Sequence, residues 1–143
     1  MRLLRTNSSQ KHLLQDFSKT ILVQRLKHIS LSAVPSWLGP CVATASRFQH
    51  SLAVGKLSFL VSGGNEDDQL LLTAASVLHD VGDGPFPHIS DQSMKEMLGF
   101  SHESAVHFAF DHSPIENRKI LEKYNIGRPR QLVIKRGVKL RVF

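Results

Sequence analysis

Cysteine is almost absent from this chain of 143 residues, since Cys41 is the only one. A single cysteine allows no internal disulfide, and it excludes a zinc site built from several thiolates. It also favours a reducing compartment, so we expect a cytoplasmic protein. Long apolar runs are absent too: none approaches the ~20 residues of a membrane span. Polar residues 6–10 stand where a signal peptide would need its apolar segment. We therefore expect neither secretion nor contact with a membrane.

Acidic residues are scarce at one end of the sequence. Residues 118–143 hold nine Lys or Arg and one acid, a net charge of +8, whereas residues 1–117 hold nine Lys or Arg and eleven acids, a net charge of −2. We therefore expect a helical core over residues 9–126 and a basic tail or hairpin over residues 127–143. Such a tail can bind nucleic acid or another polyanion, and the alternative is a solvated surface.

Apolar residues recur at three- and four-residue spacing through most of the core, as they do in helices. The third predicted helix follows Asn65, a residue suited to capping it, and is apolar nearly all round, which predicts a central position. Residues 131–143 end in Val and Leu alternating with Lys and Arg, as in a hairpin. The fold class is therefore mainly all-α, with a possible short C-terminal β-hairpin. The other predicted helices cover residues 9–29, 47–61, 90–98, 101–110 and 114–124.

The third predicted helix ends in His79 and Asp80, and a turn with two glycines and two prolines follows. Imidazole nitrogen and carboxylate oxygen together suit a borderline divalent metal. The pair is also explained by a buried histidine with a carboxylate partner at a helix end. His50 lies one turn into the preceding helix, on or beside its apolar stripe. A lone histidine there is usually a core residue with a satisfied ring.

Taken together, these stretches resemble the HD-domain metal-dependent phosphohydrolases, and in particular the branch of deoxynucleoside triphosphate triphosphohydrolases. Residues 47–51 read RFQHS and residues 78–88 read LHDVGDGPFPH, which are similar to the R-F-x-H-S and L-H-D-x-G-H-G-P-F-S-H motifs of that branch. Residues 24–29, QRLKHI, resemble an upstream helix of the branch, and residues 102–103 resemble a downstream H-E pair. The resemblance implies an HD-domain helical bundle.

The resemblance also implies a divalent metal ion, one of Mn, Fe, Zn, Ni, Co or Mg, bound by His50, His79 and Asp80. It implies that Arg47 binds substrate phosphate, since a guanidinium can hold a phosphate through two hydrogen bonds. The implied function is hydrolysis of a nucleotide or related phosphate ester by a metal-activated water. A homo-oligomer is possible.

Catalytic roles are implied for His88 and His102, which would line the pocket and assist proton transfer. Asp83 is a third candidate, but it stands where this branch has histidine. Its carboxylate could recruit a second ion, or polyphosphate chemistry could be weakened. The family also has a fourth metal ligand, a distant aspartate, and no aspartate follows Asp111. The alternative to an enzyme is therefore a truncated or degenerate HD domain that binds metal, nucleotide or another protein without catalysis.

Overall fold

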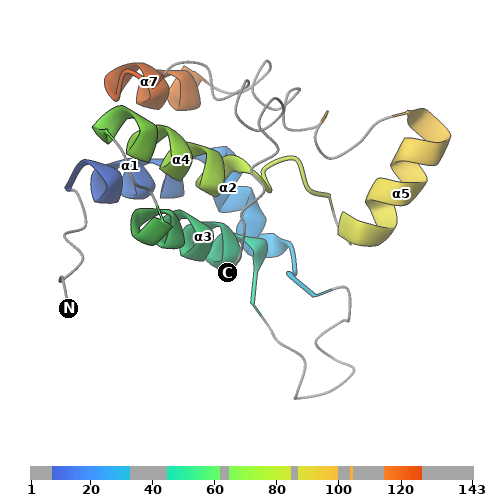
Figure 1. Ribbon diagram of the computed structural model, residues 1–143. Coiled ribbons are helices and arrows are strands. Elements are labelled where there is room, and N and C mark those ends of the chain that lie inside the picture. The colour runs from blue at the N-terminus through green and yellow to red at the C-terminus, as the bar shows by residue number, and fades with distance from the viewer. Residues whose placement is uncertain are drawn as a thin grey trace.

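A computed structural model describes residues 8–32, 45–61, 65–84, 87–99, 104 and 115–126. In that part of the chain the regular elements are helices, and the only β contact is an isolated bridge between Ser30 and Ser46 (Figure 1). The all-α fold class is confirmed, while the predicted hairpin over residues 131–143 lies outside the described residues. The elements are α1 (Ser8–Ser18), α2 (Ile21–Arg25), η1 (Leu26–His28), α3 (Arg47–Val61), α4 (Glu66–Leu78), α5 (Pro87–Leu98) and α7 (Ile115–Lys123).

Helix α4 lies at the centre of the bundle, where it packs on both α3 and α1. Asn65 caps its start, because its side-chain oxygen accepts a hydrogen bond from the Asp68 backbone N–H at 2.8 Å. The cap and the central position are both as the sequence predicts. None of the described helices is long and apolar enough to span a bilayer. The helical core buries Leu13, Phe17, Leu26, Leu70, Ala74, Val77 and Leu78, among others.

Side chains from α1 and α4 converge on Gly55 of α3. A Cβ atom there would lie 2.7 Å from Val77 Cγ2 on α4 and 2.8 Å from Leu14 Cδ1 on α1. Both distances are too short for a carbon–carbon contact, so a side chain at this position would require the Val77 and Leu14 side chains to move. Glycine at this position therefore allows α3 to pack closely against α4 and α1.

Beside this contact lies a neutral polar network made by Gln10 of α1, Ser58 of α3 and Thr73 of α4. Thr73 Oγ1 lies 3.0 Å from Ser58 Oγ and accepts a hydrogen bond from Gln10 Nε2 at 3.2 Å. It also donates to the Gln69 carbonyl at 2.8 Å. All three side chains are buried. The network ties the three helices together by hydrogen bonds without any charged group.

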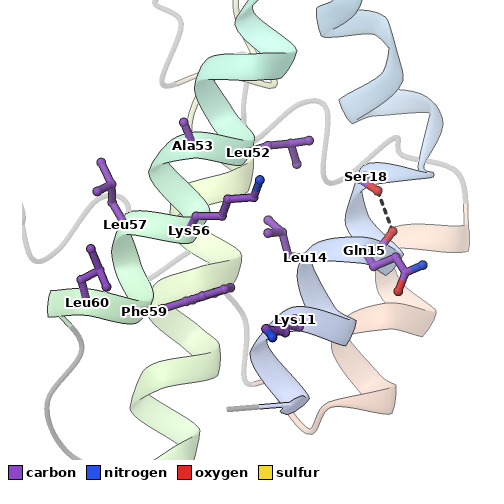
Figure 2. Close-up of a pocket in the computed structure, with 10 residues that line it drawn as sticks. All are labelled: Lys11, Leu14, Gln15, Ser18, Leu52, Ala53, Lys56, Leu57, Phe59 and Leu60. Atoms are coloured by element: carbon purple, nitrogen blue, oxygen red, sulfur yellow. Dashed lines mark hydrogen bonds between the residues drawn. The ribbon is translucent and has the colours of Figure 1, made fainter. Parts of the chain in front are cut away.

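The prediction of one continuous helix over residues 9–29 is wrong, because the chain leaves the helical conformation at Thr20 (φ −69°, ψ 148°). The Ser18 hydroxyl donates to the Gln15 carbonyl at 2.7 Å (Figure 2). The Thr20 hydroxyl donates to the Phe17 carbonyl at 2.9 Å. These side chains satisfy carbonyl groups at the end of α1, so they compete with a continued helix. A second short helix, α2, then starts in a new direction.

The remaining helices follow the sequence more closely. Helix α5 begins at Pro87, a few residues earlier than predicted, because proline suits the first helical position. It ends before Gly99, whose φ of +65° favours glycine. Most of the helix predicted over residues 101–110 lies outside the described residues. Helix α7 is confirmed, and Lys123 at its end contacts α1 through Asp16, at 2.7 Å between Nζ and Oδ2.

An open apolar groove of about 780 Å³ lies between α1 and α3 (Figure 2). None of the predicted site residues lines it, so the groove is separate from the candidate metal centre. Its walls include Leu14, Leu52, Leu57 and Leu60, with Lys11 and Lys56 beside them.

Candidate metal centre

The centre is built where α4 ends. Leu78 is the last residue of α4, and His79 and Asp80 begin a tight turn in which the Asp83 N–H donates to the Asp80 carbonyl at 3.0 Å. His79 Nδ1 lies 2.7 Å from the Ser76 carbonyl of the last helical turn. This contact fixes the ring and leaves Nε2 facing Asp80, the arrangement usual for a metal-binding histidine.

His50, from the first turn of α3, completes a group of three possible ligands. One ligand atom from each of His50, His79 and Asp80 lies within 4.8 Å of the other two. His79 Nε2 is 2.9 Å from Asp80 Oδ1, and His50 Nε2 is 3.8 Å from Asp80 Oδ2. Two imidazole nitrogens and one carboxylate oxygen form a donor set that suits Mn, Fe, Co, Ni or Zn. These three side chains therefore fit a divalent cation.

The electrostatics of His50 and Asp80 agree with this fit, whereas those of His79 favour its protonated form. Burial lowers the pKa of His50 despite the opposing charge of Asp80, which favours the neutral imidazole that binds metal. Burial also lowers the pKa of His79, but the hydrogen bond and charge of Asp80 outweigh it, so that pKa is raised. Burial raises the pKa of Asp80, yet hydrogen bonds from His79 and Arg47 hold it below the usual value. A metal ion bound by His79 and Asp80 would therefore compete with a proton for these two side chains.

Arg47, the first residue of α3, forms a charged cluster with Asp80 and Asp83. Its Nη1 atom lies 3.1 Å from Asp80 Oδ2 and 3.1 Å from Asp83 Oδ2, and the three side chains are only 8%, 9% and 7% exposed. Its Nε atom is buried without a hydrogen-bond partner. The guanidinium is therefore held between two carboxylates. The roles predicted for Arg47 in phosphate binding and for Asp83 in catalysis stay predictions.

Arg25 supports this turn, a part that the sequence analysis did not assign. Its Nη2 atom donates to the carbonyl oxygens of Val81 and Asp83, each at 2.8 Å. Arg25 ends α2, which exists because the chain breaks at Thr20. The resemblance of residues 24–29 to an upstream helix pointed to this stretch, but the spacing of its residues gave no reason to place Arg25 beside the metal ligands.

Five of the seven predicted site residues are thus brought together at one end of α3 and α4. For His88 the backbone alone is described, in the first turn of α5, and His102 lies outside the described residues. Their predicted roles in proton transfer stay predictions.

Comparison with known proteins identifies the family. Residues 47–131 match the model of the HD domain, which covers more than half of the chain and includes His50, His79 and Asp80. The chain belongs to the HD-domain family. HD domains are metal-dependent, and the group formed by His50, His79 and Asp80 could hold the ion. The match bears out the family predicted from the two motifs.

Individual relatives carry the name of one enzyme. The chain is 34% identical over 103 residues to the deoxynucleoside triphosphate triphosphohydrolase SAMHD1 of Xenopus laevis, an alignment that covers 62% of this chain and 16% of the relative. It is 34% identical over 114 residues to the same enzyme of Danio rerio, covering 70% and 18%. It is 30% identical over 103 residues to a homolog of Dictyostelium discoideum, covering 63% and 20%. The chain thus spans a fifth or less of the length of these relatives.

Proposed function

We propose that this HD domain is a metal-dependent phosphohydrolase that cleaves a nucleotide or a related phosphate ester. The observation that carries the proposal is the convergence of His50 from α3 with His79 and Asp80 from the end of α4. Three possible ligands, one from α3 and two from the turn after α4, lie beside a buried arginine. An arginine next to a metal ion suits the binding of a phosphate.

Each residue has a proposed task. His50, His79 and Asp80 hold the ion, which when bound supplies a water of lowered pKa and neutralises charge on the phosphate. Arg47 directs N–H groups towards a phosphate oxygen, and His88 or His102 donates a proton to the leaving oxygen. The two imidazoles argue against Mg as the resident ion, since Mg prefers oxygen ligands, but they do not distinguish among Mn, Fe, Co, Ni and Zn.

A second function is a non-catalytic HD domain that binds metal, nucleotide or another protein. The pairing of Arg47 with Asp83 favours it, because a guanidinium already held by two carboxylates is less available to a phosphate.

Phosphate release separates the two functions. The protein is purified without a metal-affinity tag, supplied with Mn²⁺, and assayed for released phosphate and nucleoside across a panel of nucleotides. We expect release that disappears in His79→Ala and persists in Asp67→Asn, which removes an exposed carboxylate at the far end of α4. Retained metal without release of any product from the panel would leave the non-catalytic function.

Three further predictions concern the bounds of the core, the basic tail and self-association. We propose that residues 9–126 form the HD-domain core and residues 127–143 a basic tail that binds a polyanion. Replacing the Lys and Arg residues of the tail by Gln should then abolish salt-dependent binding to duplex DNA, and unchanged binding would contradict the proposal. Self-association, also considered from the sequence, is measured by light scattering over a range of protein concentrations.

A further inference from the structure

The charged cluster of Arg47, Asp80 and Asp83 contains more negative than positive charge. One guanidinium meets two carboxylates at 3.1 Å each, and all three side chains are less than a tenth exposed. When His50 and His79 are neutral, Arg47, Asp80 and Asp83 together carry a net charge of −1. A bound divalent ion would change the net charge of the site to +1. Asp80 is a proposed metal ligand, so Asp83 is the carboxylate whose charge the metal does not need.

Asp83 is held firmly in this position by its backbone. Its N–H donates to the Asp80 carbonyl at 3.0 Å, and its own carbonyl accepts a hydrogen bond from Arg25 Nη2 at 2.8 Å. Arg47 is fixed as well, since its backbone N–H donates to the Ile29 carbonyl at 2.8 Å. With both backbones fixed, the two side chains are held within reach of each other at the turn that carries the possible metal ligands.

This pairing has a consequence for the anion that the site accepts. A phosphate that approaches Arg47 must share the guanidinium with Asp83 and meets the repulsion of its buried charge, which is screened little by solvent. The repulsion grows with the charge of the ligand. A phosphate monoester carries about −1.5 to −2, and a triphosphate carries roughly twice that charge. The cost of Asp83 therefore falls most heavily on polyphosphates.

We propose that Asp83 determines substrate charge: by pairing with Arg47 it discriminates against polyphosphates and leaves the site suited to esters of a single phosphate group. This inference rests on the proposed function and narrows its substrate class to nucleoside monophosphates, phosphodiesters or other esters with one or two negative charges. The relatives named above are triphosphohydrolases, and a carboxylate at this position would separate this chain from that substrate.

The test compares two anions that the protein does not consume. Inorganic phosphate and imidodiphosphate, a diphosphate whose P–N–P bridge resists hydrolysis, are titrated by calorimetry into the full chain at a fixed concentration of free Mn²⁺. We expect Asp83→Asn to tighten imidodiphosphate binding by about tenfold or more and phosphate binding by less than about threefold. Asp67→Asn, which makes the same change in net charge at an exposed position, should alter neither.

Asp83→His serves as a second variant in case the asparagine variant does not fold, and it should shift the two affinities in the same direction. Equal changes for both anions, or unchanged imidodiphosphate binding in a folded variant, would overturn the inference. The wild-type protein gives an independent reading, because binding imidodiphosphate more than about tenfold tighter than phosphate would also overturn it. Elemental analysis before titration separates this inference from the proposed function. A wild-type protein that holds no Mn²⁺ refutes the proposed function. A wild-type protein that holds Mn²⁺, with anion binding unchanged by Asp83→Asn, refutes this inference alone.

Discussion

Two groups of buried polar side chains link α3 to α4 or to the turn that follows it, and they are built in opposite ways. The neutral polar network of Gln10, Ser58 and Thr73 contains no charge, and each member bonds to another helix or to a helical carbonyl. In the charged cluster, the Arg47 guanidinium contacts the carboxylates of Asp80 and Asp83 at 3.1 Å each. The Arg47 Nε atom is left without a hydrogen-bond partner. The neutral network has its hydroxyl groups hydrogen-bonded, whereas the charged cluster keeps an excess negative charge and an unpaired donor.

The difference separates a group that serves the fold from one that we propose serves a ligand. A buried network with its hydrogen bonds satisfied fixes how helices pack. Buried charges are costly to remove from water, and an unequal number of opposite charges makes the cost larger. The charged cluster lies beside two half-buried histidines, His50 and His79, whose rings face the Asp80 carboxylate. We infer that the charged cluster, which includes the possible metal ligand Asp80, serves a ligand more than it serves stability.

Asp80→Asn should have the largest effect, because this residue is both a proposed ligand and a partner of Arg47. We expect metal affinity to fall by more than about 100-fold and phosphate release to reach background. In EDTA the variant should still unfold cooperatively, since Arg47 keeps Asp83 as a partner. Equilibrium dialysis with Mn²⁺ and circular dichroism measure the two properties. A full equivalent of tightly bound metal in the variant would show that Asp80 is not a ligand.

Arg25→Met should have the next largest effect, because it removes two hydrogen bonds to the turn without touching a ligand. Supports of this kind typically change metal affinity by about 10–100-fold. We expect a loss in that range, again by equilibrium dialysis, with Lys119→Met on α7 as an exposed control. Affinity equal to that of the wild type would mean that the turn holds its shape without Arg25.

Thr73→Val tests the other side of the comparison. The substitution keeps the shape of the side chain but removes the hydroxyl that contacts Gln10 and Ser58, so buried polar groups lose a partner. We expect the free energy of unfolding in urea to fall by about 1–3 kcal/mol, with metal binding unchanged. Thr73→Ser, which keeps the hydroxyl, should lose less. A loss of metal binding in folded Thr73→Val would break the separation between the two groups.

Asp16→Asn should have the smallest effect, and one that depends on pH. The hydrogen bond from Lys123 is the main reason that the pKa of Asp16 lies below its usual 3.8. The carboxylate therefore stabilises the fold above the pKa of the unfolded chain, and this contribution is lost as the pH falls through the lower pKa of the folded state. We expect the melting temperature of the variant to be about 1–3 °C lower near neutral pH. The difference should shrink below about pH 4, and a constant difference would contradict this assignment.

Local signals in the sequence predicted α3 and α4, because apolar spacing and the Asn65 cap act within a few residues. The end of the helix near Thr20 was not predicted, because the apolar spacing continues across it. What ends α1 there is hydrogen bonding from the hydroxyls of Ser18 and Thr20 to nearby carbonyls. Competition of that kind does not change the hydrophobic pattern, so the pattern alone predicted a single helix.

The site shows the same limit at longer range. His79 and Asp80 were recognisable together because they are adjacent, and the motif at residues 47–51 pointed to Arg47 and His50. The hydrogen bond between Arg47 and Asp80 joins residues 33 positions apart, and the one from Arg25 to Asp83 spans 58 positions. Contacts at such separations depend on how the helices pack, so the spacing of residues in the sequence does not predict them.

The central claim is that His50, His79 and Asp80 bind one metal ion. The most direct measurement is the metal content, by elemental analysis, of protein purified without an affinity tag, alongside His50→Ala. Of the three proposed ligands, His50 alone comes from α3. We predict close to one equivalent of a transition metal per wild-type chain, and less than about a tenth of that in a folded His50→Ala variant. Metal absent from the wild type, or bound equally well by the variant, would contradict the claim.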